Sequence, residues 1–294
     1  MKANTASKTA QYMALYRALE TRRPRNRRLF TDPYAIHFLD KGFRLACRLS
    51  AFRPAENLFY RIMQRRIPGA LASGLARTRY IDELLENAIG QGARQVIILG
   101  AGFDTRSLRL PFLKALPVIE IDHPDTARKK LQLLKKIAPS LPGNTRYLQL
   151  DFNLRDLDSL LREQVIDCTI PTVMVWEGVT NYLQKEAIDQ TFAFAARFPP
   201  ESSIIFTYVD QKVLEDPSTF FGAERLLKDL SAIGEDWTFG FVPELLPPYL
   251  RNFSFQLLED RGAADYREKY LPERKGILQG YEFYRVALAG RTGL

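Results

Sequence analysis

Carboxylates at the ends of successive apolar segments are the first residues of this sequence that suggest chemistry. Asp122, Asp151 and Glu177 each follow a short run of apolar residues. The carboxyl ends of neighbouring parallel strands meet at one edge of a sheet, so these three side chains are expected to converge. Carboxylates accept hydrogen bonds from ribose hydroxyls and from an exocyclic amine, which favours an adenosine-containing ligand. Taken singly, each acid could equally cap a helix.

A glycine-containing bend precedes the three acids. The buried-strand pattern of Val96 to Leu99 is followed by Gly100 and Gly102, whose missing Cβ atoms permit positive φ and close approach of a ligand. A third glycine of the dinucleotide-binding pattern is absent, because Thr105 stands in its place. That glycine lets a helix pack close beneath a pyrophosphate. Its absence favours a nucleoside ligand without a diphosphate, such as S-adenosylmethionine, over NAD.

An arginine precedes the bend on a predicted helix. Arg77 lies in the segment Ser73 to Tyr80, which leads toward the first strand. A guanidinium group there could bind the carboxylate of a methionine group with two parallel hydrogen bonds. Arg79 is the adjacent alternative, and an ordinary surface arginine is the competing interpretation.

Several motifs occur together and in order. They are Tyr16–Glu20, Leu29–Pro33, Ala76–Arg79, Leu99–Arg106, Glu120–Pro124 and Trp176–Leu183. In this combination the sequence resembles the leucine carboxyl methyltransferase family, and most closely its bacterial branch of polyketide-biosynthesis O-methyltransferases. The resemblance extends from about residue 5 to residue 210. The variable region beyond residue 215 is where substrate choice is expected to reside.

The resemblance assigns roles to residues of this chain. Arg77 would hold the carboxylate of S-adenosylmethionine, and Gly100 would pass beneath its methionine part. Asp122 would accept hydrogen bonds from the ribose hydroxyls, while Asp151 and Phe152 would contact the adenine. The residues expected to bind the cofactor are Arg77, Gly100, Gly102, Asp122, Asp151, Phe152 and Glu177.

Catalytic residues are less sharply indicated than cofactor residues. By the resemblance, Glu177 would lie near the amino group or the methionine end of the cofactor. The chain departs from the branch at His123, which could act as a general base or simply be exposed beside the cofactor loop. The candidates for contact with the methyl acceptor are Tyr182, Tyr208 and Asp210, at the ends of the fourth and fifth predicted strands. Packing without a chemical role is the alternative for both tyrosines.

The order of predicted elements indicates an α/β fold. Strands and helices alternate from residue 95 onward, which implies a parallel sheet with right-handed crossovers. Strands are predicted at 95–100, 117–121, 145–150, 171–176, 202–208, 253–258 and 281–288, and helices at 5–20, from Asp32-Pro33, at 54–67, 73–88, 124–138, 154–164, 184–197 and 217–232. We therefore expect a Rossmann-like, seven-stranded methyltransferase sheet, mostly parallel with an antiparallel last strand. Residues 1–90 would form a helical cap and 91–294 the core, together making one structural unit.

The composition of the chain limits the kinds of partner that it is expected to bind. The chain has 294 residues and a net charge of +8, but no zinc-ligand spacing or RNA-binding aromatic signature accompanies its basic residues. Solvated surface charge is therefore favoured over a nucleic-acid partner, and no metal site is predicted. Cys47 and Cys168 are expected to be reduced thiols. Without a secretory signal or an apolar run of about 18 residues, a cytoplasmic protein with no membrane partner is expected.

The favoured function is O-methyl transfer from S-adenosylmethionine to a small-molecule carboxylate or phenol. A carboxylate is already ionised at neutral pH, whereas a phenol with a pKa of about 10 benefits from a base. A cofactor-binding protein without turnover would show the same cofactor residues. Methylation of RNA or of a protein C-terminal carboxylate are further alternatives. The sequence leaves the acceptor and the oligomeric state open.

Overall fold

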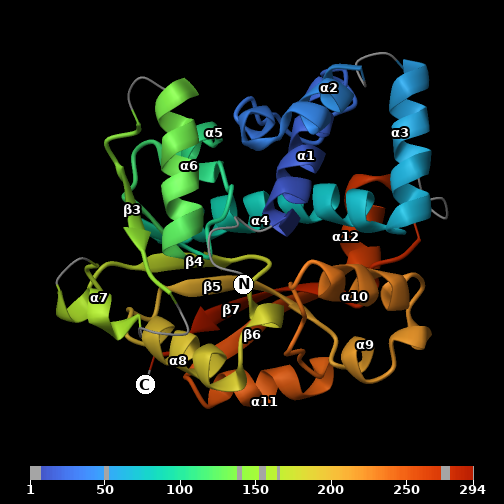
Figure 1. Ribbon diagram of the computed structural model, residues 1–294. Helices are drawn as coiled ribbons and strands as arrows, with labels where there is room; N and C mark the ends of the chain where they lie inside the picture. The colour runs from blue at the N-terminus through green and yellow to red at the C-terminus, as the bar shows by residue number, and fades with distance from the viewer. Residues whose placement is uncertain are drawn as a thin grey trace.

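A seven-stranded sheet forms the centre of the computed structural model, which describes residues 8–49, 53–137, 141–151, 157–163, 166–272 and 279–293 (Figure 1). Its strand order is β3-β2-β1-β4-β5-β7-β6. The first five strands pair in parallel, whereas β7 is antiparallel to both β5 and β6. The strands are β1 (Gln95–Leu99), β2 (Val118–Asp122), β3 (Thr145–Gln149), β4 (Thr172–Trp176), β5 (Ser203–Val209), β6 (Phe255–Gly262) and β7 (Tyr284–Arg291). The predicted fold class is confirmed.

Helices cover both faces of this sheet. Figure 1 shows α4 and α12 on one side of β4 and β5, with α8 and α11 on the other. Short 3-10 turns occupy Ala35–Phe38, Pro111–Leu113, Thr180–Tyr182, Pro217–Thr219 and Pro243–Leu245. The helices of the described ranges are α1 (Lys8–Arg22), α2 (Lys41–Leu49), α3 (Arg53–Arg66), α4 (Ala70–Gly90), α5 (Arg106–Arg109), α6 (Pro124–Ile137), α7 (Asp158–Arg162), α8 (Lys185–Ala195), α9 (Lys212–Glu215), α10 (Ala223–Ala232), α11 (Leu246–Arg251) and α12 (Ala263–Tyr270).

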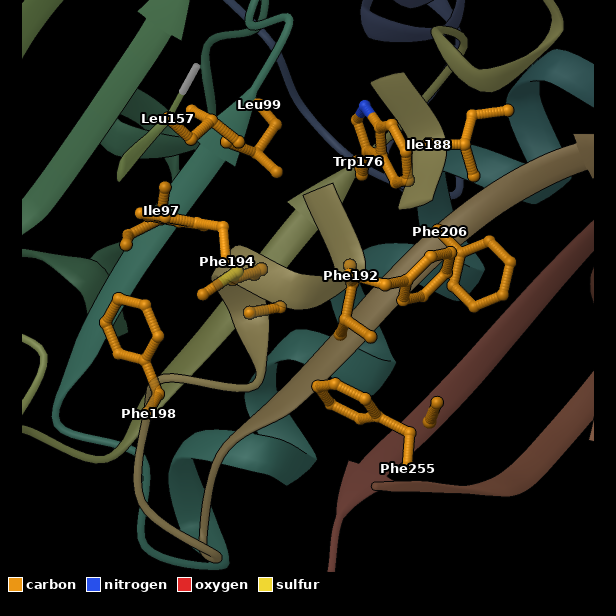
Figure 2. Close-up of a cluster of buried hydrophobic side chains, with 14 of the residues drawn as sticks. Ile97, Leu99, Leu157, Trp176, Ile188, Phe192, Phe194, Phe198, Phe206 and Phe255 are labelled. Carbon is orange, nitrogen blue, oxygen red and sulfur yellow. The ribbon is translucent and has the colours of Figure 1, made fainter. Parts of the chain in front are cut away.

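The continuous apolar sequence of β1 follows from burial on both faces. Successive side chains of a strand point to opposite sides, so Ile97 and Leu99 join the core under α8 and α11. Val96 and Ile98 instead join the core on the opposite face of the sheet, to which α4 and α12 also contribute. Phe192 of α8 lies near the middle of the first core (Figure 2), with its ring centroid 5.8 Å from that of Trp176 and 5.3 Å from that of Phe206. Aromatic packing of this kind holds the outer helix layer against the strands.

The N-terminal segment departs from its predicted pattern in two places. Asp32 was expected to begin a helix, and its Oδ1 does accept hydrogen bonds from the N–H groups of Tyr34 (3.1 Å) and Ala35 (3.0 Å). Only a four-residue 3-10 turn follows, however. Helix α2 was not predicted, because its nine residues are fewer than the window of about 11–18 residues in which a helical period is recognised.

Glycine and tyrosine conformations explain two boundary differences in the last third of the chain. The helix predicted at 217–232 is divided by Gly222, whose φ of 81° places it in the left-handed region before α10 begins. The last strand begins at Tyr284 rather than at residue 281 because Gly280 and Tyr281 both have positive φ, at 113° and 68°. Left-handed residues interrupt the regular extended backbone.

Replacing Phe192 with alanine tests the importance of the aromatic core. Its ring is fully buried, so truncation leaves a cavity and is expected to lower the free energy of unfolding by about 3–5 kcal/mol. Urea unfolding monitored by circular dichroism measures the change. Leu258→Ala, at a side chain that is 51% exposed, serves as the control and should change stability by less than about 1 kcal/mol. Equal losses in the two variants would contradict this description of the core.

Candidate functional site

The backbone turns sharply where β1 ends. Gly100 and Gly102 have φ of 63° and 46°, in the left-handed region that disfavours a side chain. A Cβ atom added to Gly100 would lie 2.3 Å from Cγ2 of Val179, so space as well as conformation requires glycine there. A hydrogen bond links the bend to the end of β2: the N–H of Gly102 donates to Oδ2 of Asp122 at 2.5 Å.

Asp122 is the last residue of β2 and is held by backbone donors. Its Oδ1 also accepts a hydrogen bond from the N–H of His123 at 2.7 Å. Burial raises the pKa of Asp122 to about 6, and this effect outweighs the two backbone hydrogen bonds, which lower it. The His123 ring bridges to the neighbouring strand end, with Nε2 3.4 Å from Oδ2 of Asp151. Asp122, His123 and Asp151 are therefore neighbours at the carboxyl edge of the sheet.

Glu177, directly after β4, joins two arginines. Its Oε1 accepts a hydrogen bond from Nε of Arg77 at 2.8 Å, and its Oε2 lies 2.9 Å from Nη2 of Arg106. Burial alone would raise the pKa of Glu177, but the Arg106 and Arg77 guanidinium groups lower it, so the carboxylate stays ionised at neutral pH. Arg77 reaches this position from α4, and its guanidinium carbon lies 4.5 Å from the ring centroid of Tyr284.

Arg106 connects Glu177 to two further acids that the sequence did not single out. Its Nε donates to Oδ1 of Asp82 at 2.8 Å, and its Nη1 pairs with the Asp104 carboxylate. Asp82 also accepts two hydrogen bonds from Arg109, at 2.7 and 2.8 Å. The signal available in the sequence was an aspartate at helical spacing from Leu75 and Leu85 on the buried side of α4, since a buried charge requires a partner.

A second buried ion pair ties α1 to the glycine bend. Nε of Arg17 donates to Oδ2 of Asp32 at 2.8 Å, and its Nη2 donates to the carbonyl oxygen of Phe103 at 2.5 Å. Thr105, which replaces the third glycine of the dinucleotide-binding pattern, donates its hydroxyl to the same Asp32 oxygen at 2.6 Å. The N-terminal helix is thereby fixed to the loop that follows β1.

The two candidate tyrosines occupy different surroundings. Burial raises the pKa of Tyr182 to about 12, and Tyr182 belongs to the 3-10 turn shortly after Glu177. Tyr208 is fully buried, and its hydroxyl donates to Oδ2 of Asp260 at 2.7 Å. Its ring packs against Phe241 in the core beneath the sheet, so the structure does not bring it to the residues around Arg77. The sequence-predicted Phe152 lies outside the described residues.

The described part of the chain contains no group of three His, Cys, Asp or Glu side chains arranged to hold a metal ion. Within the same ranges, none of the helices has the length and apolar character needed to cross a bilayer.

The sheet order, the glycine bend after β1 and the acid ending β2 define a doubly wound, nucleotide-binding type of α/β protein. The leucine carboxyl methyltransferase model matches residues 10–196, and the chain belongs to that family.

Individual relatives agree with this assignment. A Bacillus subtilis protein named "Putative S-adenosyl-L-methionine-dependent methyltransferase YktD" is 30% identical over 211 residues, covering 71% of this chain and 69% of the relative. A similarly named Mycolicibacterium smegmatis protein is 28% identical over 97% of this chain and 95% of its own length. The crystal structure of a DUF574 family protein from Streptomyces avermitilis is 14% identical and has a TM-score of 0.61, with 98% of each chain covered. That likeness shows the same fold.

Arg106→Gln tests the buried charge cluster. The change leaves Asp82, Asp104 and Glu177 with fewer cationic partners in a buried setting and is expected to cost about 3–5 kcal/mol of stability. The measurement is the free energy of unfolding in urea. Arg128→Gln, which removes an exposed partner of Asp125, is the matched control and should cost less than about 1 kcal/mol. A similar small cost for both would mean that the cluster does not support the site.

Proposed function

We propose that this protein is an S-adenosylmethionine-dependent O-methyltransferase that acts on a small-molecule carboxylate or phenol. The observation that carries the proposal is the alignment of Asp122, the Gly100–Gly102 bend and the Arg77–Glu177 pair across adjacent strands. Family membership and the names of the relatives support the methyl donor. The resemblance of the sequence to polyketide-biosynthesis O-methyltransferases supports oxygen as the atom that accepts the methyl group. It also supports a methyl acceptor from polyketide biosynthesis.

The residues present suit the chemical groups of S-adenosylmethionine. An arginine and a carboxylate 2.8 Å apart at the end of β4 match the carboxylate and the ammonium of the amino-acid part. Asp122, on the other side of β1, offers acceptor oxygens to a ribose diol. Between them, the two glycines leave the backbone without side chains at the bend. In this proposal Asp151 and Phe152 contact the adenine.

The bound cofactor supplies an electrophilic methyl group, and the chain has to orient the acceptor and exclude water. The candidate bases are weak at neutral pH or already engaged. The Tyr182 hydroxyl, with its pKa raised to about 12 by burial, remains protonated. His123 is the alternative and is engaged with Asp151, with its Nε2 3.4 Å from Oδ2 of that residue. A carboxylate or an acidic phenol, which needs no strong base, is therefore the acceptor that this site favours.

Asp122→Ala tests the ribose contact. Loss of hydrogen bonds to the ribose hydroxyls is expected to weaken binding of S-adenosylmethionine by about 1–3 kcal/mol. Isothermal titration calorimetry measures the affinity, with NAD as the competing ligand, which should not bind the wild-type protein. Asp125→Ala, one residue into α6, provides a neighbouring control. Unchanged affinity in Asp122→Ala would remove Asp122 from the site.

The raised pKa of Asp122 predicts a pH dependence. Below pH 6 the carboxyl binds a proton and loses acceptor capacity, so the Kd for S-adenosylmethionine should increase, approaching about tenfold per pH unit. Above pH 6 the affinity should level off. Calorimetry at successive pH values measures this slope. The increase in Kd below pH 6 should disappear in Asp122→Asn and remain in His123→Gln. If the increase remained in Asp122→Asn, another group would be responsible for it.

Transfer of a labelled methyl group tests the activity itself. Wild-type protein is incubated with labelled S-adenosylmethionine and sets of aromatic and aliphatic acids, phenols, peptides with free C-termini, and RNA. The proposal expects label on a small-molecule oxygen. Label on RNA or on peptide C-termini would contradict the substrate class. Cofactor binding without transfer to any set would favour a non-catalytic binding protein.

A further inference from the structure

Two consecutive helices expose pairs of large apolar side chains. On α2, Leu45 and Leu49 are 57% and 58% exposed, and on α3, Leu58 and Ile62 are 59% and 48% exposed. Each pair has a spacing of four residues, which places its members on one face of a helix. These four account for most of the exposed large apolar side chains in the described ranges; the others are Phe221, Leu245 and Leu258.

The exposed pairs are not the faces that hold these helices to the protein. Helix α2 packs through Phe43 and Cys47, and α3 packs through Tyr60 and Met63, all in the core shared with α1. Both helices therefore carry apolar residues on two faces, only one of which is covered. A helix that is apolar on opposite sides is suited to burial on both. Figure 1 shows α2 and α3 rising beyond α4, on the side away from β4 and β5.

Both helices also carry exposed basic residues. Residues 41–66 contain seven lysines and arginines but only one glutamate. Among them the described and exposed side chains are those of Lys41, Arg48, Arg61, Arg65 and Arg66. Basic residues next to leucine and isoleucine are the composition of helices that lie in the plane of an anionic lipid surface. The apolar side chains enter the acyl boundary, and the basic side chains contact the headgroups.

We propose that α2 and α3 form a docking surface for anionic lipid bilayers. A second copy of the chain fits this surface less well. A two-fold interface would bring each basic face against its own counterpart, and like charges in contact oppose association. A bilayer with anionic headgroups offers both the negative charge and the apolar interior that the exposed side chains require. The proposed docking is peripheral and requires no membrane-spanning helix.

Vesicle flotation tests the proposal without cofactor or methyl acceptor, so its outcome is independent of the proposed enzymatic activity. Wild-type protein is mixed with phosphatidylcholine vesicles that contain or lack phosphatidylglycerol. We expect retention on the anionic vesicles only, decreasing as salt is raised. The double variant Leu45→Ser/Leu49→Ser and its α3 counterpart Leu58→Ser/Ile62→Ser should each reduce partitioning by about tenfold or more.

The matched control is the double variant Leu245→Ser/Leu258→Ser, which removes leucines of similar exposure elsewhere on the surface and should bind like wild type. Circular dichroism and urea unfolding establish that all variants are folded. Failure of wild type to bind anionic vesicles would overturn the proposal, as would equal binding by patch and control variants. A wild-type dimer in light scattering that the patch variants convert to monomer would assign the surface to a second copy instead.

Discussion

The buried ionic cluster around Arg106 is the interaction on which the arrangement of the site depends. Arg106 follows the glycine bend, and it binds Asp82 of α4, Asp104 of the bend and Glu177 after β4. Removing these charges from water costs several kcal/mol per group, and the cost is recovered only when every group is paired. The bend, the helix and the strand end must therefore keep one relative position. This constraint holds Glu177 where Arg77 also reaches it.

The same principle makes the N-terminal helices part of the site. Arg17 of α1 pairs with Asp32, which also accepts a hydrogen bond from Thr105 in the loop after the bend. Helix α4 packs on β4, β5 and β7 and carries Arg77. The N-terminal ninety residues thus supply a helix that covers one face of the sheet, together with Arg77, which is proposed to bind the cofactor carboxylate. The boundary predicted at residue 90 separates two regions that share this core.

Local patterns made most of the fold predictable. The apolar run of β1 is long and doubly buried, so its position follows from the sequence, and the glycines after it fix the place of the bend. The positions of Asp122 and Glu177 could be predicted because each directly adjoins a strand. Helix α2 escaped prediction because nine residues are too few for a helical period to stand out in the sequence.

Contacts between distant residues could not be predicted in the same way. Asp82 and Arg106 are 24 positions apart, and Tyr208 meets Asp260 across 52 positions. No local period encodes such pairs; they depend on which helix covers which face of the sheet. The placement of Tyr208 in the core illustrates this limit, because a residue near a strand end can point to either face.

A crystal structure of the protein grown with S-adenosylhomocysteine tests the central claim most directly. The account predicts the ribose hydroxyls on Asp122, the amino-acid carboxylate on Arg77 and the amino group beside Glu177, with the backbone of Gly100 beneath the methionine part. A ligand bound away from the carboxyl edge of β1, β2 and β4, or a saturated crystal without ligand at that edge, would contradict it.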